Sequence, residues 1–298
     1  MQTRKWLITL VVAGILTAMG LLIFKSSQLP SSPPLPSPNG YDDFVKAGQM
    51  LASNTSRYDE MSDEQLRQLV TQNAEALRLV RTGLSRECRV PLAYSQTDMG
   101  NHISELGSIK QLVQALNAEG RLAEMEHRNN DAARAYLDAM RLGHEATRGG
   151  PLIDGLVRIA CEATGSRSLQ KLVTNLDARE CREVINALEI IEKKQESFEE
   201  VLKNEREWRQ RSFPFYQQIV RSLMRLFNVA SVKQAEQRAS QKFQTQEKRR
   251  RELMLDVAVR AYDLEKGQRP KSIAELVPDY LKAIPKDPLT GTNMIYSP

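Results

Sequence analysis

Apolar residues recur at helical spacing along the chain from Tyr41 onward. Ser62 and Gln65 have the spacing of a capping box, and Asp177 with Glu180 marks a second capped helix start. No run before residue 285 has the alternation that is typical of a strand. The pattern therefore predicts an all-α fold. The predicted helices cover residues 62–80, 103–125, 132–139, 152–173, 177–208, 213–229 and 232–266.

Two of these patterns, around residues 113–142, resemble one tetratricopeptide repeat, which is a pair of packed helices. Gly120, Ala132, Tyr136 and Ala139 fall where that repeat places its small and bulky contacts. We find no second copy at the repeat's period of about 34 residues. Because each unit of a solenoid buries its face against a neighbour, we expect a helical hairpin inside a bundle rather than a repeat array.

The N-terminus carries Arg4 and Lys5 and then stays uncharged from Trp6 to Phe24. At a rise of about 1.5 Å per residue, a helix over this stretch is roughly 28 Å long, which matches the hydrocarbon core of a bilayer. We expect a signal anchor that enters the lipid bilayer through residues 6–24; the alternative is a signal peptide cleaved near Ala18-Met19-Gly20. Because the positive charges precede the span, the prediction is a single-pass protein of the cytoplasmic membrane, with a cytoplasmic N-terminus and the bulk of the chain extracytoplasmic.

The segment after the predicted span reads SSQLPSSPPLPSPNG, with five Pro and five Ser over residues 26–40. Such a composition favours extended polyproline II, which acts as a semi-rigid spacer of about 3.1 Å per residue. The spacer would hold the next domain roughly 45 Å from the membrane. The predicted organisation is an anchor at 1–25, a linker at 26–40, a helical domain at 41–266 and a C-terminal clasp at 267–298.

The end of the chain contains the residues that are typical of a segment that leaves a helix and folds back. Gly267 suits the position after a helix C-terminus and Pro270 prevents the helix from continuing. Ser272 and Glu275 have capping-box spacing for a short helix over residues 273–277. We expect a structural clasp; the alternative is a tail that recognises a partner. The residues expected to dock on the bundle are Leu276, Tyr280, Leu281, Ile284, Ile295 and Tyr296.

The charge of the chain is concentrated in its N-terminal region. The 298 residues include 42 Lys and Arg against 37 Asp and Glu, a net charge of +5, and Arg4, Lys5 and Lys25 account for most of the excess. Bulk charge therefore gives nucleic-acid binding no support, and we expect no nucleic-acid partner. A hydrophobic fraction of 41% is sufficient for a core, and scarce aromatics at 6% disfavour a β-sandwich.

Candidate chemistry in the chain is sparse. Glu124 and His127 have the Glu-x-x-His spacing of di-iron bundles, but a second such motif is missing. Asp98 and His102, four residues apart, are typical of a surface pair. Cys88, Cys161 and Cys181 lack metal or redox spacing, and Cys161 lies in an apolar pattern that favours burial. We find no phosphate loop, dinucleotide fingerprint or nucleophile elbow, so we expect no catalytic, cofactor or metal residues and no enzyme activity.

Two segments in the second half of the chain remain as candidate surfaces. Residues 248–251 read Lys-Arg-Arg-Arg and are interleaved with acids, which favours a solvated helix face. The stretch at 213–229 is amphipathic, so it can lie in a membrane interface, enter a partner's groove or pack in its own core. We select it as the partner or membrane contact. The contact residues are Phe215, Ile219, Leu223 and Phe227, with Arg221 and Arg225 beside them.

Residues 112–173, with the run LNAEGRLAEMEHRNNDAARAYLDAMRLG, and residues 253–296, with KSIAELVPDYLKAIPKDPLTGTNMIY, resemble a family of uncharacterised bacterial membrane-anchored helical proteins. The ending is also distantly similar to type II secretion pseudopilins. The matching residues are Gly267, Pro270, Tyr280, Leu281, residues 285–288, Gly291 and Tyr296. The chain departs from that family because it has no acid before Asp42, where pseudopilins need a Glu in their apolar helix.

From these observations we expect a membrane-anchored, non-enzymatic helical interaction or scaffold protein of the bacterial envelope, with a protein partner. The alternative is an accessory component of an envelope secretion or pilus-like assembly, which the pseudopilin resemblance implies. A third reading, a hydrolase or metal enzyme in the helical body, depends on Glu124 and His127 alone.

Overall fold

The computed structural model describes residues 34–52, 55, 57–92, 96–212 and 229–296. Over these residues the fold is all-α, as predicted, with a single antiparallel bridge between Lys286 and Asn293 and no strand. Short 3-10 turns lie at Tyr58–Glu60, Val173–Asn175 and Ile273–Leu276. The α-helices are α2 (Gly40–Gln49), α3 (Asp63–Gln72), α4 (Ala74–Leu84), α5 (Gln96–Met125), α6 (Asn129–Glu145), α7 (Leu152–Leu172), α8 (Ala178–Lys194), α9 (Phe198–Ser212) and α11 (Val229–Lys266).

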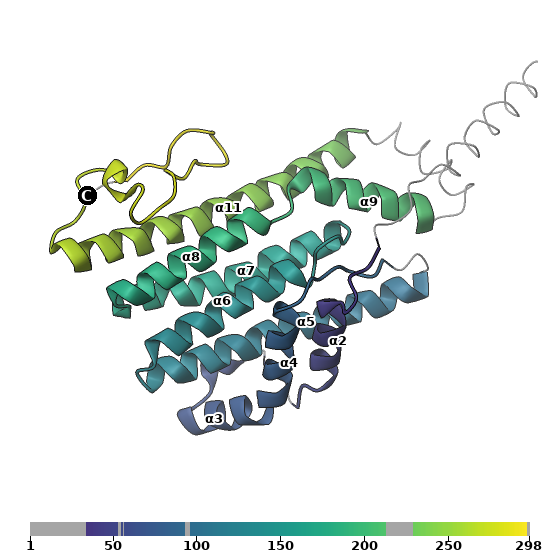
Figure 1. Ribbon diagram of the computed structural model, residues 1–298. Helices are drawn as coiled ribbons and strands as arrows, with labels where there is room; N and C mark the ends of the chain where they lie inside the picture. Colours follow the sequence, from purple (N-terminus) through teal and green to yellow (C-terminus); the bar gives the residue numbers. More distant parts are fainter. Residues whose placement is uncertain (1–33, 53–54, 56, 93–95, 213–228, 297–298) are drawn as a thin grey trace, which may run out of the picture.

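The long helices form an elongated bundle, in which α6 packs against α5, α7 and α8, and α11 packs against both α7 and α8 (Figure 1). The three short helices α2, α3 and α4 cover α5 at one edge of the bundle, whereas the C-terminal segment lies along α11 at the other edge (Figure 1). The chain therefore enters the folded body at the edge opposite to the one where it ends.

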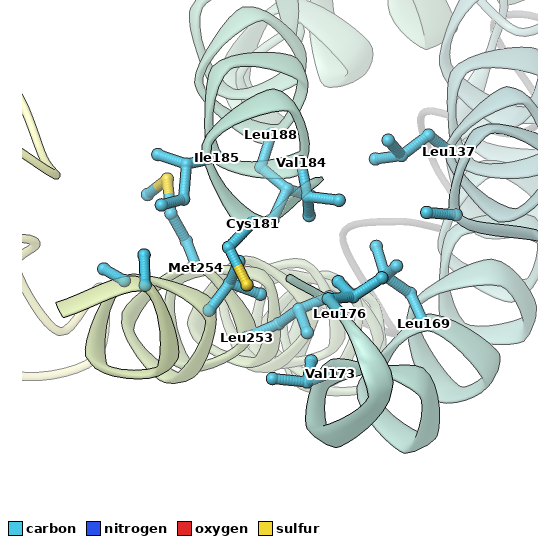
Figure 2. Close-up of a cluster of buried hydrophobic side chains, with 14 of the residues drawn as sticks. Leu137, Leu169, Val173, Leu176, Cys181, Val184, Ile185, Leu188, Leu253 and Met254 are labelled. Atoms are coloured by element: carbon cyan, nitrogen blue, oxygen red, sulfur yellow. The ribbon is translucent and has the colours of Figure 1, made fainter. Parts of the chain in front are cut away.

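One core joins the second half of the molecule. The apolar face of α8 presents Val184, Ile185 and Leu188 toward α11, which contributes Leu253 and Met254 (Figure 2). The end of α7 and the turn after it close the cluster with Leu169, Val173 and Leu176. A second cluster lies under α2, α4, α5 and α6 and includes the buried Cys161, as its apolar pattern predicted. All three cysteines are buried and unpaired.

The predicted capped helix starts are confirmed at two positions. Gln65 and Ser62 satisfy each other's backbone N–H groups at the start of α3. At the start of α8, the Glu180 N–H donates to Asp177 Oδ1 at 2.7 Å and the Asp177 N–H donates to Glu180 Oε2 at 2.8 Å. The third predicted box is wrong: the Glu275 N–H donates to the Ser272 carbonyl at 3.2 Å rather than to its hydroxyl, and the Glu275 carboxylate accepts the Tyr262 hydroxyl at 2.8 Å.

The hairpin of α5 and α6 has the close contact that its sequence predicted. Gly120 lies against the ring of Tyr136, so close that a Cβ at Gly120 would stand 2.8 Å from Tyr136 Cδ1. The Tyr136 hydroxyl donates back to Glu124 on the same helix as Gly120. Absence of a side chain at Gly120 thus sets the separation of the two helices.

The continuous helix predicted over 177–208 is wrong, because the chain breaks between α8 and α9. Ser197 forms a further capping box: its backbone N–H donates to Glu200 Oε2 at 2.7 Å, and its hydroxyl accepts the Glu200 N–H at 3.2 Å. The Glu196 carboxylate accepts the backbone N–H of Gly149 at 2.9 Å. These interactions satisfy the free N–H groups of a new helix start and hold the break in place.

The C-terminal segment docks through most of the residues expected. Leu276, Tyr280 and Leu281 are buried in the main core, and Gly267 has a φ of +68°, the left-handed conformation that ends a helix. Ile295 was expected to dock but is 91% exposed, and Met294 is buried in its place. Adjacent side chains of extended chain point in opposite directions, so burial of Met294 turns Ile295 outward.

The predicted membrane span at 6–24 and most of the linker at 26–40 lie outside the described residues. In the part of the chain that the structure describes, no helix combines the length and the apolar composition needed to cross a bilayer.

Candidate functional site

A groove of about 910 Å³ runs between α7, α11 and the C-terminal segment. Its α7 wall is built from residues spaced three or four apart, which places them on one face of the helix. The residues that line it are Ala163, Ser166, Arg167, Gln170 and Lys171 of α7, Lys248, Arg249, Glu252, Leu253, Leu255 and Asp256 of α11, and Asp287, Thr290, Thr292, Asn293, Met294 and Ile295 of the C-terminal segment.

The groove has an apolar base and a polar rim. Leu253, Leu255 and Met294 are buried and belong to, or lie beside, the main core. Ile295 stands exposed at the edge. A surface of this kind offers contact area to an apolar side chain and orientation through the charges around it.

One ion pair and one hydrogen bond join the walls of the groove. Lys248 of α11 donates to Asp287 of the C-terminal segment at 2.7 Å, and Gln170 of α7 donates to Asp256 of α11 at 2.8 Å. The bond from Lys248, together with the backbone N–H of Leu289, keeps the pKa of Asp287 below its usual value. Asp287 is therefore ionised at neutral pH and secures the turn that forms one side of the groove.

Three cations on the rim have no counter-charge in the described structure. Arg167 and Lys171 of α7 and Arg249 of α11 are exposed, and no described carboxylate lies within ion-pair distance of them. Glu252 and Asp256 are exposed acids on this rim that likewise form no ion pair with a described residue, so three unpaired cations face two unpaired acids. The groove thus presents a net positive rim to its surroundings.

A buried ion network lies behind the groove and corrects the solvated face expected at 248–251. Arg250 is only 1% exposed. Its guanidinium donates to Glu162 of α7 at 2.6 Å, to Glu192 of α8 at 2.8 Å and to Gln195 at 2.5 Å. The face turns inward because α11 packs against both α7 and α8, so one side of the basic run must point into the bundle.

The same network continues to a histidine. His144 Nε2 of α6 lies 3.0 Å from Glu162 Oε2. Burial raises the pKa of Glu162, but the charge of Arg250 and the hydrogen bonds from Arg250 and His144 outweigh it and lower that pKa to about 2. Burial lowers the pKa of His144, so the imidazole is neutral at neutral pH and donates its N–H to the Glu162 carboxylate.

Arg251, next in the run, extends these contacts to the C-terminal segment. It donates to Glu192 Oε1 at 2.5 Å and to the backbone carbonyl of Lys286 at 2.6 Å. Glu192 therefore bridges two arginines of α11, and one of them holds the C-terminal chain. Helices α6, α7, α8 and α11 and the C-terminal segment are joined by one continuous set of charged hydrogen bonds.

A second buried set ties α7 to the first half of the molecule. His102 Nε2 of α5 lies 3.0 Å from both carboxylate oxygens of Asp154, and its Nδ1 is 3.2 Å from the Tyr41 hydroxyl, which donates to Glu105 at 2.7 Å. The expected surface pair of Asp98 and His102 is thus wrong for the histidine, which is buried and bonded to Asp154.

The remaining predicted site residues are the six contact residues of the amphipathic segment and the pair of Glu124 and His127. Phe215, Ile219, Leu223, Phe227, Arg221 and Arg225 lie outside the described residues. Glu124 accepts the Tyr136 hydroxyl, and His127 follows the end of α5 with a positive φ of 59°. Among the described residues, no group of three or more His, Cys, Asp and Glu side chains is arranged to hold a metal ion.

The groove and the networks were not foreseen from the sequence. One signal was present: Asp154, Arg158 and Glu162 recur every four residues inside the apolar pattern of α7, and all three are buried. Charged residues on the same face of a helix as core residues are expected to be buried and to bond partners there. The groove itself gave no such signal, because its walls come from three distant segments.

Comparison with known proteins finds no matching family model, no similar curated protein and no similar solved structure. The resemblances described above to membrane-anchored helical proteins and to pseudopilins stay predictions from the residues alone.

Proposed function

We propose that this chain is a membrane-tethered, non-enzymatic helical interaction protein whose groove between α7, α11 and the C-terminal segment binds an acidic segment of a partner protein. The observation that carries the proposal is the rim of Arg167, Lys171 and Arg249, three exposed cations without described counter-charges around an apolar base. Charge complementarity of this kind guides encounter and orients a partner.

The composition of the groove favours a peptide over a polyanion that carries charge alone. The apolar base of Leu253, Leu255 and Met294 gains nothing from phosphate or sugar, whereas it can bury an aliphatic side chain of a peptide. The Thr290 and Thr292 hydroxyls and Asn293 add short polar groups that can bond a peptide backbone.

The sequence predicts a tethered protein in three parts. Residues 6–24 would enter the bilayer, residues 26–40 would act as a spacer, and the helical domain would stand outside the cytoplasm. In the described part, the chain enters at α2 and the groove lies beside α11 at the opposite edge of the bundle (Figure 1).

The amphipathic segment at 213–229 remains a second predicted contact. The C-terminal residues also predict an alternative role, that of an accessory component in an envelope secretion or pilus-like assembly. Both are compatible with a groove that receives a protein segment. The groove is the feature on which the proposal depends.

The test uses the full-length protein in nanodiscs and a fluorescent peptide that alternates Glu with Leu. We expect binding that weakens as salt rises, because exposed charges are screened. The variant R167E/K171E/R249E should lose at least about tenfold in affinity, since three attractions become repulsions. The control K110E/K193E/K242E changes net charge equally at exposed cations outside the groove and should bind like the wild type.

Two outcomes would overturn the proposal. One is equal loss of affinity in both triple variants, which would mean that net charge alone governs binding. The other is stronger binding of a single-stranded oligonucleotide of matched charge than of the peptide, which would make the partner a nucleic acid.

A further inference from the structure

A second cavity, of about 450 Å³, lies beside the buried ion network and shares only Asp287 with the lining of the proposed groove. It is enclosed by α7, by the junction between α8 and α9, by α11 and by the loop at 286–291. Its volume is in the range of small-molecule sites. Two of the polar side chains that line it, Arg158 and Gln246, are almost fully buried and have unused hydrogen-bonding capacity.

Arg158 of α7 is a buried cation without a direct counter-ion. It is 5% exposed, and its described polar contact is one bond from Nη1 to the backbone carbonyl of Glu196 at 3.2 Å. Its guanidinium carbon lies 4.9 Å from the centre of the Phe243 ring. No described carboxylate lies within ion-pair distance, in contrast to Arg250 of α11, which lines the same cavity and pairs with Glu162 and Glu192. A guanidinium has five N–H groups, so most of its donors remain available.

Gln246 of α11 supplies a second unused donor. Its side chain is 3% exposed, and its Nε2 has no hydrogen-bond partner among the described residues. A buried amide without a partner costs stability, so such groups are rare unless a ligand or water completes them. Gln246 and Arg158 line the same cavity from two different helices.

The start of α9 adds favourable electrostatics. Ser197, Phe198 and Glu199 line the cavity at the first turn of this 15-residue helix, and the Ser197 hydroxyl caps only the N–H of Glu200. The positive end of the helix dipole therefore lies at the cavity. Four of the five acids on the wall are already engaged: Glu162 with Arg250, Glu247 with Arg251, Asp287 with Lys248, and Glu196 with the backbone of Gly149. The fifth, Glu199, is exposed and pairs with no described cation.

The remaining wall is aromatic and apolar. Phe198 and Phe243 have ring centres 5.0 Å apart, and Ile159 lies near them on α7. Gly155 permits the close approach of α11, because a Cβ there would stand 2.5 Å from Phe243 Cζ. A ligand that fits must therefore combine an anionic end with an apolar body.

We propose that this cavity binds a small aryl or alkyl carboxylate, with its carboxylate accepting from Arg158 and Gln246 and its hydrocarbon part packed against Phe198 and Phe243. A carboxylate matches the fork of a guanidinium and also accepts from the amide N–H group. The residues proposed to contact the ligand do not line the partner groove, and the proposal does not rest on the function proposed above.

Calorimetry of the full-length protein in nanodiscs with phenylacetate tests the site. We expect saturable binding of phenylacetate, and binding at least about tenfold weaker for the neutral isostere phenylacetamide and for inorganic phosphate. The variant Q246L should weaken phenylacetate binding about tenfold without lowering the melting temperature, since it removes an unpartnered buried group. R158K should weaken it at least as much, because the ammonium lacks the fork.

The control is Q241L, the same substitution at an exposed position of α11 outside the cavity, which should bind phenylacetate like the wild type. Absence of binding at about 10 mM phenylacetate would overturn the proposal. Equal affinity for phenylacetamide, preference for phosphate, or wild-type affinity in Q246L would overturn it as well.

Discussion

Arg250 illustrates how a charged residue becomes part of a core. Its guanidinium is surrounded by Glu162, Glu192 and Gln195, which accept from all three of its nitrogens. A buried pair adds little net stability compared with apolar residues, but removal of one partner is costly because the other charge stays buried. We therefore infer that the network fixes the register of α7, α8 and α11.

The first prediction concerns this residue. R250M should lower the free energy of unfolding by about 3–5 kcal/mol, because it leaves Glu162 ionised and uncompensated in the interior. The measurement is urea unfolding followed by circular dichroism. The adjacent exposed residue provides the control: R249M should change stability by less than about 0.5 kcal/mol. The double variant E162Q/R250M should recover part of the loss, and a lack of recovery would show that packing rather than charge is responsible.

Two histidines should respond to pH in opposite directions. Burial lowers the pKa of His144 below its ordinary 6.5, so the unfolded chain takes up a proton first and His144 costs stability as the pH falls through 6.5. Burial also lowers the pKa of His102, but the hydrogen bond and charge of Asp154, with help from Glu105, raise it overall. His102 therefore contributes stability below pH 6.5 that is lost as the pH rises through its folded pKa.

The second prediction follows from this contrast. Between pH 7.5 and 5.5, the stability of wild type relative to H144Q should fall with acidification, by at most about 1.4 kcal/mol per pH unit. The stability of wild type relative to H102Q should rise over the same interval. Urea unfolding at four pH values provides both comparisons, and slopes of the same sign would contradict the assigned protonation states.

At the scale of the helices, the hairpin of α5 and α6 depends on one glycine. The third prediction is that G120A lowers the free energy of unfolding by about 1–3 kcal/mol, because a Cβ would overlap the Tyr136 ring, which is fixed in the core. Gly107 lies on the same helix with no atom within 4 Å of a Cβ position. G107A should therefore stabilise the protein by about 0.5–1 kcal/mol, since Ala is the better helix former. Thermal unfolding of both variants checks the pair.

Two of the three capping signatures recognised in the sequence mark the start of an α-helix. Ser62 and Asp177 mark the starts of α3 and α8 as predicted. The break before α9 was missed, although Ser197 and Glu200 have the same spacing, because the surrounding apolar pattern continued without a Gly or Pro. Ser272 has the signature without the bonds, because the Glu275 N–H bonds the Ser272 carbonyl and the Glu275 carboxylate accepts the hydroxyl of Tyr262 from another element. Local motifs thus predict a cap only where tertiary contacts do not compete.

At the scale of the molecule, the helical period predicted the class of fold but not the functional surfaces. Which face of α11 turns inward depends on the packing of α7 and α8, so the burial of Arg250 could not be deduced from 248–251 alone. The groove combines segments around residues 163–171, 248–256 and 287–295, which no local pattern connects. The docking of the C-terminal segment was easier to predict. Its apolar residues do not belong to a long helix, so they can be buried only by packing against the bundle.

The fourth prediction tests the docking of that segment. L281A should lower the free energy of unfolding by about 2–5 kcal/mol, because Leu281 is buried in the main core. I295A, which truncates an exposed side chain on the same segment, should change stability by less than about 0.5 kcal/mol. Chemical unfolding of both variants measures the two changes in the free energy of unfolding. Equal changes would mean that the C-terminal segment is not anchored through Leu281.

The most direct test of the central claim is photo-crosslinking in native membranes, with a photoreactive residue placed at Arg167 or Arg249 in the full-length protein. The account predicts that both positions crosslink to the same protein, and that Lys110 and Lys193, exposed outside the groove, do not. It also predicts that the crosslinked peptide of that protein is rich in Asp and Glu. Crosslinks of equal yield at all four positions, or none at the groove, would contradict the assignment of this groove as the binding site.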